Sequence, residues 1–164
     1  MAFLDNWTSI LILVSALGTG LMAGLFFIFS VCVMKALSRL PSSEGIVVMQ
    51  HINETIINPF FGILFFGTAL ACAISVIVAL LHLQNPGALY TLVGGTCYLT
   101  GSLLVTFVFN IPRNNALAKV DAQTTESATF WNEFLSTWTA WNHVRTLSST
   151  AAAVAFIISA GYHW

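Results

Sequence analysis

Charged side chains are scarce in this chain of 164 residues, because Asp, Glu, Lys and Arg together make up only 7% of it. An ordinary soluble domain carries about 25% charged residues, so the composition excludes that class and indicates an integral membrane protein. The net charge is −1 and the five basic residues form no cluster, which leaves no electrostatic footprint for nucleic acid. The length fits a single membrane domain, residues 1–164, without a separate soluble domain.

Cysteines are also few, and the three present lie in apolar surroundings at Cys32, Cys72 and Cys97. None of them has the CxxC or zinc-site spacing, so we interpret all three as packing residues. The N-terminal sequence has no basic segment before its first apolar stretch. We therefore expect that stretch to be a retained membrane span rather than a cleaved signal peptide.

Four apolar stretches are present, at about residues 8–34, 60–83, 88–110 and 146–162. Their lengths suit helices that cross a bilayer, although the alanine-rich fourth is the weakest. Gly20 and Gly24 in the first stretch form a GxxxG pattern, which favours close packing of helices within the chain. The sequence thus predicts an all-α fold, a membrane four-helix bundle. A homo-oligomer stays open.

Two connections carry most of the polar residues. Between the first two spans, residues 45–58 show the period of an amphipathic helix, with His51, Glu54 and Asn58 on one face and Asn53 on the apolar side. A long loop is expected at residues 111–128, and a helix that begins near Thr129 should lead into the fourth span. On that helix the spacing predicts one shared face for five residues: Trp131, Phe134, Trp138, Asn142 and Arg145.

The basic residues all lie in the same two connections, between spans one and two or between spans three and four: Lys35, Arg39, Arg113, Lys119 and Arg145. The positive-inside rule then places both connections in the cytoplasm. Both termini and the turn between spans two and three would lie on the outer side of the cell membrane.

Several polar side chains of these connections could form a site. His51 and Glu54, three residues apart on a helix, fit a base with its orienting carboxylate, two metal ligands, or the exposed face of an interfacial helix. His143 points about 140° away from Trp138 at 100° per residue, which is typical of a surface residue. A metal held by His51, Glu54 and His143, or haem held by the two histidines, remains an alternative. The paired Glu and Glu-x-x-His sets of a di-iron bundle are missing from the sequence.

Arg145 stands at the entrance of the fourth apolar stretch, where a cation is costly unless it has a partner or a ligand. It could be an arginine that extends its charged end to the interface and fixes the topology. Asn142 and Trp138 on the same predicted face make a ligand-facing role at least as good an interpretation.

Three motifs resemble the anthrone oxygenase-like family of small integral membrane proteins. Asn110-Ile-Pro-Arg-Asn-Asn-Ala-Leu117 is similar to the family's N-x-P-x-N-N-x-L at the end of span three. Trp138-x3-Asn142-x-Val144-Arg145 is the second match, and His51-Ile-Asn53, leading to Asn58-Pro59, is similar to bacterial members. The resemblance covers nearly the whole chain, and most members have no assigned activity.

The resemblance implies a membrane-embedded oxidoreductase, a monooxygenase that oxidises a lipophilic polycyclic aromatic or phenolic substrate with dioxygen, since fungal members are implicated in converting anthrones to anthraquinones. The catalytic residues would be His51 as base, Glu54 as its orienting group and Arg145 as the cation that faces the oxyanion. The expected substrate contacts are Asn53, Asn110, Asn114, Asn115, Trp138, Asn142 and His143. This chemistry requires no cofactor, although metal or haem stays open. The partners would be a lipophilic small molecule and membrane lipids.

A different class of function fits the same residues. The chain could be a non-enzymatic membrane protein that binds a lipophilic ligand or serves as an accessory subunit. The amides and Arg145 would then hold a headgroup or a partner. Binding without turnover would distinguish this hypothesis from an oxygenase.

Overall fold

The computed structural model describes the backbone of residues 2–162 and the side chains from Trp7 onward, and this part of the chain is helical without any strand. The first long helix consists of α1 (Ala2–Ile28), the π-helical η1 (Phe29–Val33) and α2 (Met34–Leu37). The connection to the next long helix carries α3 (Ser42–Ile56). The remaining elements are α4 (Pro59–Leu81), α5 (Ala88–Tyr98), η2 (Leu99–Leu104), η3 (Thr106–Asn110), α6 (Ile111–Leu117) and α7 (Ser127–Ala160).

Within the described residues, three helices are long and apolar enough to cross a membrane: Trp7–Leu37, Pro59–Leu81 and Ala88–Leu117. The chain is therefore all-helical with the features of a multi-pass membrane protein, as the composition predicts. The apolar half of α7, residues 146–160, extends only about 22 Å at 1.5 Å per residue. That is less than the hydrocarbon thickness of about 30 Å, so α7 does not belong to this group by apolar length.

Glycines mark where the long helices approach most closely. A Cβ atom on Gly18 of α1 would meet Thr68 of α4, and one on Gly95 of α5 would meet Val76 and a backbone carbonyl of α4. Gly101 of η2 lies equally close to Ser148 of α7. The GxxxG pair does not serve this purpose, because Gly20 and Gly24 are exposed and Gly24 has open space around it. The predicted internal packing role thus belongs to Gly18 instead.

The third long helix continues well beyond Asn110, which corrects the predicted loop at 111–128. Pro112 falls in the first turn of α6, directly after the π-helical η3, at a position where a proline costs little helical bonding. The guanidinium of Arg113 donates to the carbonyl oxygen of Phe109 at 2.8 Å and also helps to satisfy the backbone there. The loop is consequently confined to residues 118–126.

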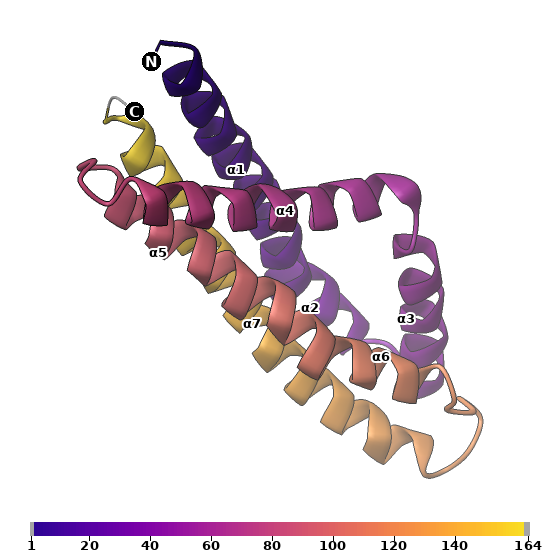
Figure 1. Cartoon of the computed structure of the whole chain (residues 1–164). Coiled ribbons are helices and arrows are strands. Elements are labelled where there is room, and N and C mark those ends of the chain that lie inside the picture. Colours follow the sequence, from indigo (N-terminus) through magenta and orange to yellow (C-terminus); the bar gives the residue numbers. More distant parts are fainter. Residues whose placement is uncertain (1, 163–164) are drawn as a thin grey trace.

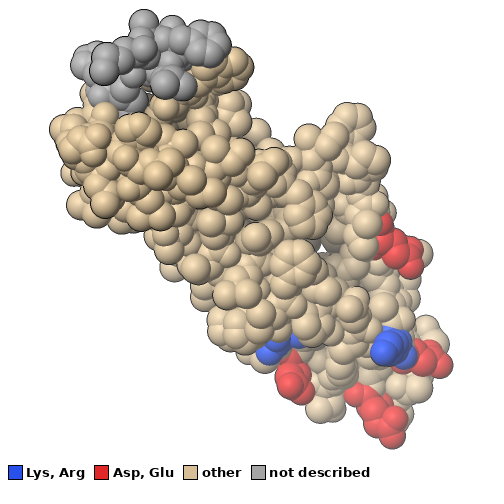
Figure 2. All heavy atoms as spheres, viewed as in Figure 1, with Lys and Arg blue, Asp and Glu red and all other residues tan. Residues whose placement is uncertain are grey.

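The helices place the polar connections together at one end of the molecule. In Figure 1 the two chain ends and the turn between α4 and α5 lie at the opposite end from α3, α6 and the start of α7. On the face drawn in Figure 2, the charged side chains of the described residues lie over the end with α3 and α6. A cluster of buried residues fastens α3 to α7 at this end, with Ile46 and Met49 packed among Trp131, Phe134 and Trp138.

Candidate functional site

A cavity of about 550 Å³ lies at the charged end of the molecule, bordered by α1, α3, the first turns of α4, the η3–α6 segment and α7. In Figure 1 the α4 helix crosses the other long helices obliquely, so that its first turns diverge from them on the side of α3. The α3 helix closes part of the resulting wedge. Its walls are mostly apolar and rich in aromatic rings, from Phe26, Phe29, Phe61, Phe65, Phe66, Phe107 and Trp138.

Arg145 is the only Lys or Arg among the residues that line this cavity, and its side chain is just 6% exposed. The guanidinium donates to Asn142 Oδ1 at 2.7 Å and to Thr106 Oγ1 at 3.3 Å. Its carbon lies 4.3 Å from the centre of the Phe26 ring and 5.1 Å from that of Trp138. Its Nε has no hydrogen-bond partner.

No carboxylate neutralises Arg145 within the part of the chain that the structure describes. The one ion pair found there joins His51 Nδ1 to Glu54 Oε2 at 3.5 Å, and both of those side chains are more than two-thirds exposed. A buried guanidinium without a counter-ion carries a desolvation cost of several kcal/mol. A ligand that brings negative charge into the cavity would offset this cost.

Asn142 holds the guanidinium in place and is itself completely buried. Its Nδ2 donates at 2.7 Å both to the carbonyl oxygen of Phe26 and to Ser30 Oγ, and its Oδ1 accepts the bond from Arg145. Because both amide hydrogens are engaged with the first long helix, the direction of Oδ1 is fixed. Asn142 thus ties α7 to that helix and orients Arg145.

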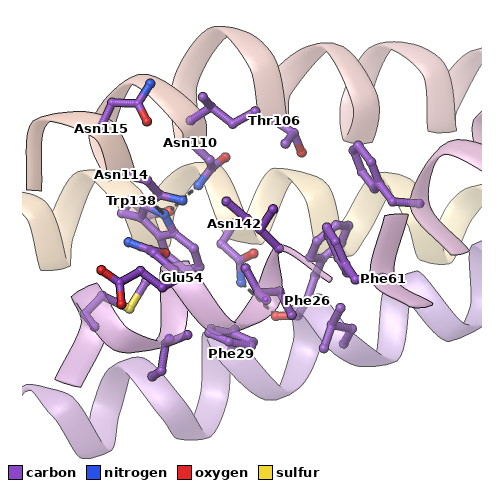
Figure 3. Close-up of a pocket in the computed structure, with 18 of the residues that line it drawn as sticks. Phe26, Phe29, Glu54, Phe61, Thr106, Asn110, Asn114, Asn115, Trp138 and Asn142 are labelled. Carbon is purple, nitrogen blue, oxygen red and sulfur yellow. Dashed lines mark hydrogen bonds between the residues drawn. The ribbon is translucent and has the colours of Figure 1, made fainter. Parts of the chain in front are cut away.

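Trp138 joins the amides of the third long helix to α7. Its Nε1 donates to Asn114 Oδ1 at 2.7 Å, and its carbonyl oxygen accepts from Asn110 Nδ2 at 3.3 Å. Figure 3 shows Asn110, Asn114 and Trp138 gathered at one end of the pocket, while Asn115 points away from them. Asn110 Oδ1 is buried and unpaired, like Nε of Arg145, so one unpaired acceptor and one unpaired donor lie in the wall of the cavity.

The residues expected on α3 lie at the rim of the cavity. His51, Asn53 and Glu54 all line it, but the His51 and Glu54 side chains are 72% and 78% exposed. Asn53 is different, because its Nδ2 is buried and has no hydrogen-bond partner. Asn53 thus has a buried, unpaired donor at the cavity wall, whereas His51 and Glu54 form an exposed pair at the rim.

The structure does not bring His143 to the cavity. The residue is exposed and lines a separate hollow on another side of α7, together with Lys35, Asn132 and Ser136. The ligand sets that combine His51 with His143, for a metal or for haem, are therefore not assembled. Among the described residues no group of three or more His, Cys, Asp or Glu side chains could hold a metal ion.

Four residues of the site have no signal in the sequence: Phe26, Phe29, Ser30 and Thr106. They are apolar or hydroxyl residues within apolar stretches. Phe26 contributes a ring to Arg145 and a carbonyl oxygen to Asn142, and Ser30 and Thr106 contribute hydroxyl groups to the same two residues. The Phe29 ring packs against Trp138. Three residues of the site lie in π-helical segments, Ser30 in η1 and Thr106 and Asn110 in η3. These segments would point to the site, but they are recognised only once the backbone structure is known. Such segments are frequent at functional sites.

Comparison with known proteins identifies one family. A family model described as anthrone oxygenase matches residues 58–155, which extend from the start of α4 into the last third of α7. The matched part contains Asn110, Asn114, Trp138, Asn142 and Arg145, but neither His51 nor Glu54. No curated protein and no solved structure matches the chain.

Proposed function

The chain belongs to the anthrone oxygenase family, and on that premise we propose that it is a membrane-embedded oxygenase for a flat, lipophilic anthrone or related phenol. The observation that carries the proposal is Arg145, a buried guanidinium without a counter-ion that faces an aromatic cavity of about 550 Å³. The walls suit a fused aromatic ring system, and the guanidinium suits the negative charge that such a substrate acquires on deprotonation.

The proposed reaction balances without an added reductant. A base removes a proton from the acidic ring CH₂ of the anthrone, and the resulting anion is aromatic. Dioxygen accepts electrons from this carbanion and forms a carbon hydroperoxide, which loses water to leave the quinone carbonyl. One oxygen atom enters the product and the other leaves as water, so the substrate itself supplies both electrons.

Each polar group of the cavity has a role in this scheme. Arg145, oriented by Asn142, stabilises the oxyanion of the deprotonated substrate, since preorganised donors act most strongly in a site with little water. Asn110 Oδ1 and Asn53 Nδ2, both buried and unpaired, are further contacts for substrate hydroxyl and carbonyl groups. Asn114 holds Trp138, and Asn115 is a contact at the outer edge. His51 with Glu54 at 3.5 Å is the proposed base, placed where a proton can leave to water.

The proposal includes a four-helix bundle with four spans in the cell membrane. One argument supports α7 as the fourth span, and a second supports the orientation. The start of α1 and the end of α7 lie at the same end of the molecule (Figure 1), so the chain must cross the membrane an even number of times. The helix that begins with α1, α4 and the helix from α5 to α6 account for three crossings, and α7 would be the fourth. The Lys and Arg side chains visible in Figure 2 lie at the opposite end, so the positive-inside rule favours that end as the cytoplasmic one and both termini outside.

A binding protein without catalytic activity remains the second candidate. The observation in its favour is the position of His51 and Glu54, which are largely exposed and lie outside the family match. The buried groups of the cavity would then hold a lipophilic anion without changing it. Turnover decides between the two functions.

The experiment measures oxygen consumption and anthraquinone formation by the protein in liposomes supplied with an anthrone. The wild type should form about one quinone for each dioxygen consumed, and His51→Ala should lose 10²- to 10⁴-fold in rate, as expected for a lost general base. Arg145→Gln should also lower the rate, because it removes the group that stabilises the oxyanion. Arg113→Gln is its matched control, because Arg113 bonds to Thr137 and Phe109 and does not line the cavity. Oxygen consumption no faster than that of empty liposomes across a panel of anthrones would favour the binding protein. Full activity of His51→Ala would preserve the oxygenase and reject its base.

A further inference from the structure

A second hollow of about 500 Å³ lies between α2 and α7, on a side of α7 that faces away from Arg145. Lys35 and Ser38 line it from the end of the first long helix, and Asn132, Ser136 and His143 line it from α7. We refer to these five residues as the Lys35–His143 groove. None of them has a role in the proposed oxidation, and nothing in the family match assigns one.

The chemistry of the groove suits a phosphate group. The Lys35 ammonium, the His143 imidazole, the Asn132 amide and the Ser136 hydroxyl are hydrogen-bond donors, whereas the Ser38 hydroxyl already donates to the carbonyl oxygen of Lys35 at 2.9 Å. No Asp or Glu is among the lining residues. An anion that enters the groove would therefore meet several donors and no opposing carboxylate.

The surface next to the groove favours a lipid over a soluble anion, because it is apolar. Val31 lies one helical turn before Lys35 in the first long helix, and Leu147 lies one turn after His143 in α7. These helices run in opposite directions, so both residues lie on the same side of the groove, toward the apolar middle of the bundle. Their side chains are 45% and 71% exposed, which provides an apolar surface for an acyl chain directly beside the donors.

We propose that the Lys35–His143 groove binds the phosphate headgroup of an anionic phospholipid, whose acyl chain lies along Val31 and Leu147. The groove opens at the charged end of the molecule, where a helix that crosses the membrane ends at Leu37. Headgroups of the adjoining leaflet lie at this level. The inference stands independently of the oxygenase function.

The test is native mass spectrometry of the full chain released from mixed micelles that contain equal amounts of phosphatidylglycerol and phosphatidylcholine. The wild type should retain one phosphatidylglycerol in preference to phosphatidylcholine. Lys35→Gln should lower this preference about fivefold, the factor that one basic residue contributes near an anionic membrane surface. Lys119→Gln is the matched control, because Lys119 is exposed in the loop after α6 and lies outside the groove.

A variant that blocks the groove without changing charge separates a defined site from general attraction. Ala140 is exposed and lines the groove, and Ala140→Trp should abolish the preference with Lys35 intact. Equal loss in Lys35→Gln and Lys119→Gln, or full retention in Ala140→Trp, would overturn the proposal. Release of the lipid by millimolar glycerol 1-phosphate would also overturn it, because the groove would then be a site for soluble phosphates.

Discussion

Replacing Arg145 by Gln tests whether the buried charge serves the ligand or the fold. The substitution removes the only Lys or Arg side chain that lines the cavity. Glutamine is shorter but retains an amide that can donate to Asn142 Oδ1, which lies 2.7 Å from the guanidinium. The change therefore removes charge while leaving the neighbouring acceptor satisfied.

The contributions of Arg145 to stability nearly cancel. Its hydrogen bonds to Asn142 and, at a longer distance, to Thr106 together contribute about 3 kcal/mol as charged bonds, and its contacts with the Phe26 and Trp138 rings about 1 kcal/mol each. Against this total of about 5 kcal/mol stands the desolvation of an unpaired guanidinium, which costs several kcal/mol. We therefore expect Arg145→Gln to change the unfolding free energy by less than about 2 kcal/mol.

Ligand binding should respond quite differently. Anthracene-9-carboxylate and its neutral carboxamide have the same ring system, and only the first carries a charge. Loss of a charged hydrogen bond corresponds to about 1.5–3 kcal/mol, so the affinity for the carboxylate should fall roughly 10- to 150-fold. The affinity for the carboxamide should change by less than about threefold, since the aromatic walls remain.

The assay combines ligand fluorescence in detergent micelles with unfolding by titration of SDS. Arg113→Gln controls for the removal of a guanidinium, because that residue bonds to Thr137 and Phe109 outside the cavity. If Arg145→Gln lowered the unfolding free energy by about 3–5 kcal/mol, the loss typical of a broken buried ion network, and bound both ligands as before, Arg145 would be structural. The oxygenase and binding hypotheses would then both lose their main support.

Three further changes test the site, the packing and the topology. Asn142→Leu should lower both stability and carboxylate affinity, because each buried group it leaves unpaired costs about 1–3 kcal/mol; an effect on affinity alone would contradict its role as a link between helices. Gly95→Ala should destabilise by about 1–3 kcal/mol through overpacking against α4, whereas Gly24→Ala, which has open space, should change SDS unfolding little, and equal effects would refute the close approach. In a cysteine-free background of intact cells, an impermeant maleimide should label Gln84→Cys and not Thr125→Cys, and the reverse pattern would invert the topology.

The sequence predicted those features that follow from the helical spacing of apolar and polar residues. Trp131, Phe134, Trp138, Asn142 and Arg145 are all buried in α7, because residues spaced by three or four positions share one helix face. The all-helical class followed from apolar length and from the scarcity of charge. The convergence of Asn142 with Arg145 was within reach because both lie on that face, one turn apart.

The remaining parts depend on tertiary geometry that no periodic pattern encodes. Pro112 predicted the end of a helix, but the π-helical turns before it let the helix continue to Leu117. The partners of Asn142 are a carbonyl oxygen and the Ser30 hydroxyl in another long helix, and neither has a sequence signature. The GxxxG spacing was visible, although only the packed structure shows that Gly20 and Gly24 face outward.

The oblique crossing of α4 connects the fold to the site (Figure 1). Phe61 and Phe65 of α4 line the cavity together with Arg145, and Phe65 also packs against Tyr98 in the core. The crossing leaves one side of Arg145 toward the cavity, while Asn142 and Thr106 hold the other side. A fold in which the first turns of α4 diverge from the other helices, and in which Arg145 is buried without a counter-ion among the described residues, loses stability for both reasons at one place. Such losses persist where function requires them, and here they coincide at the mouth of a single aromatic cavity.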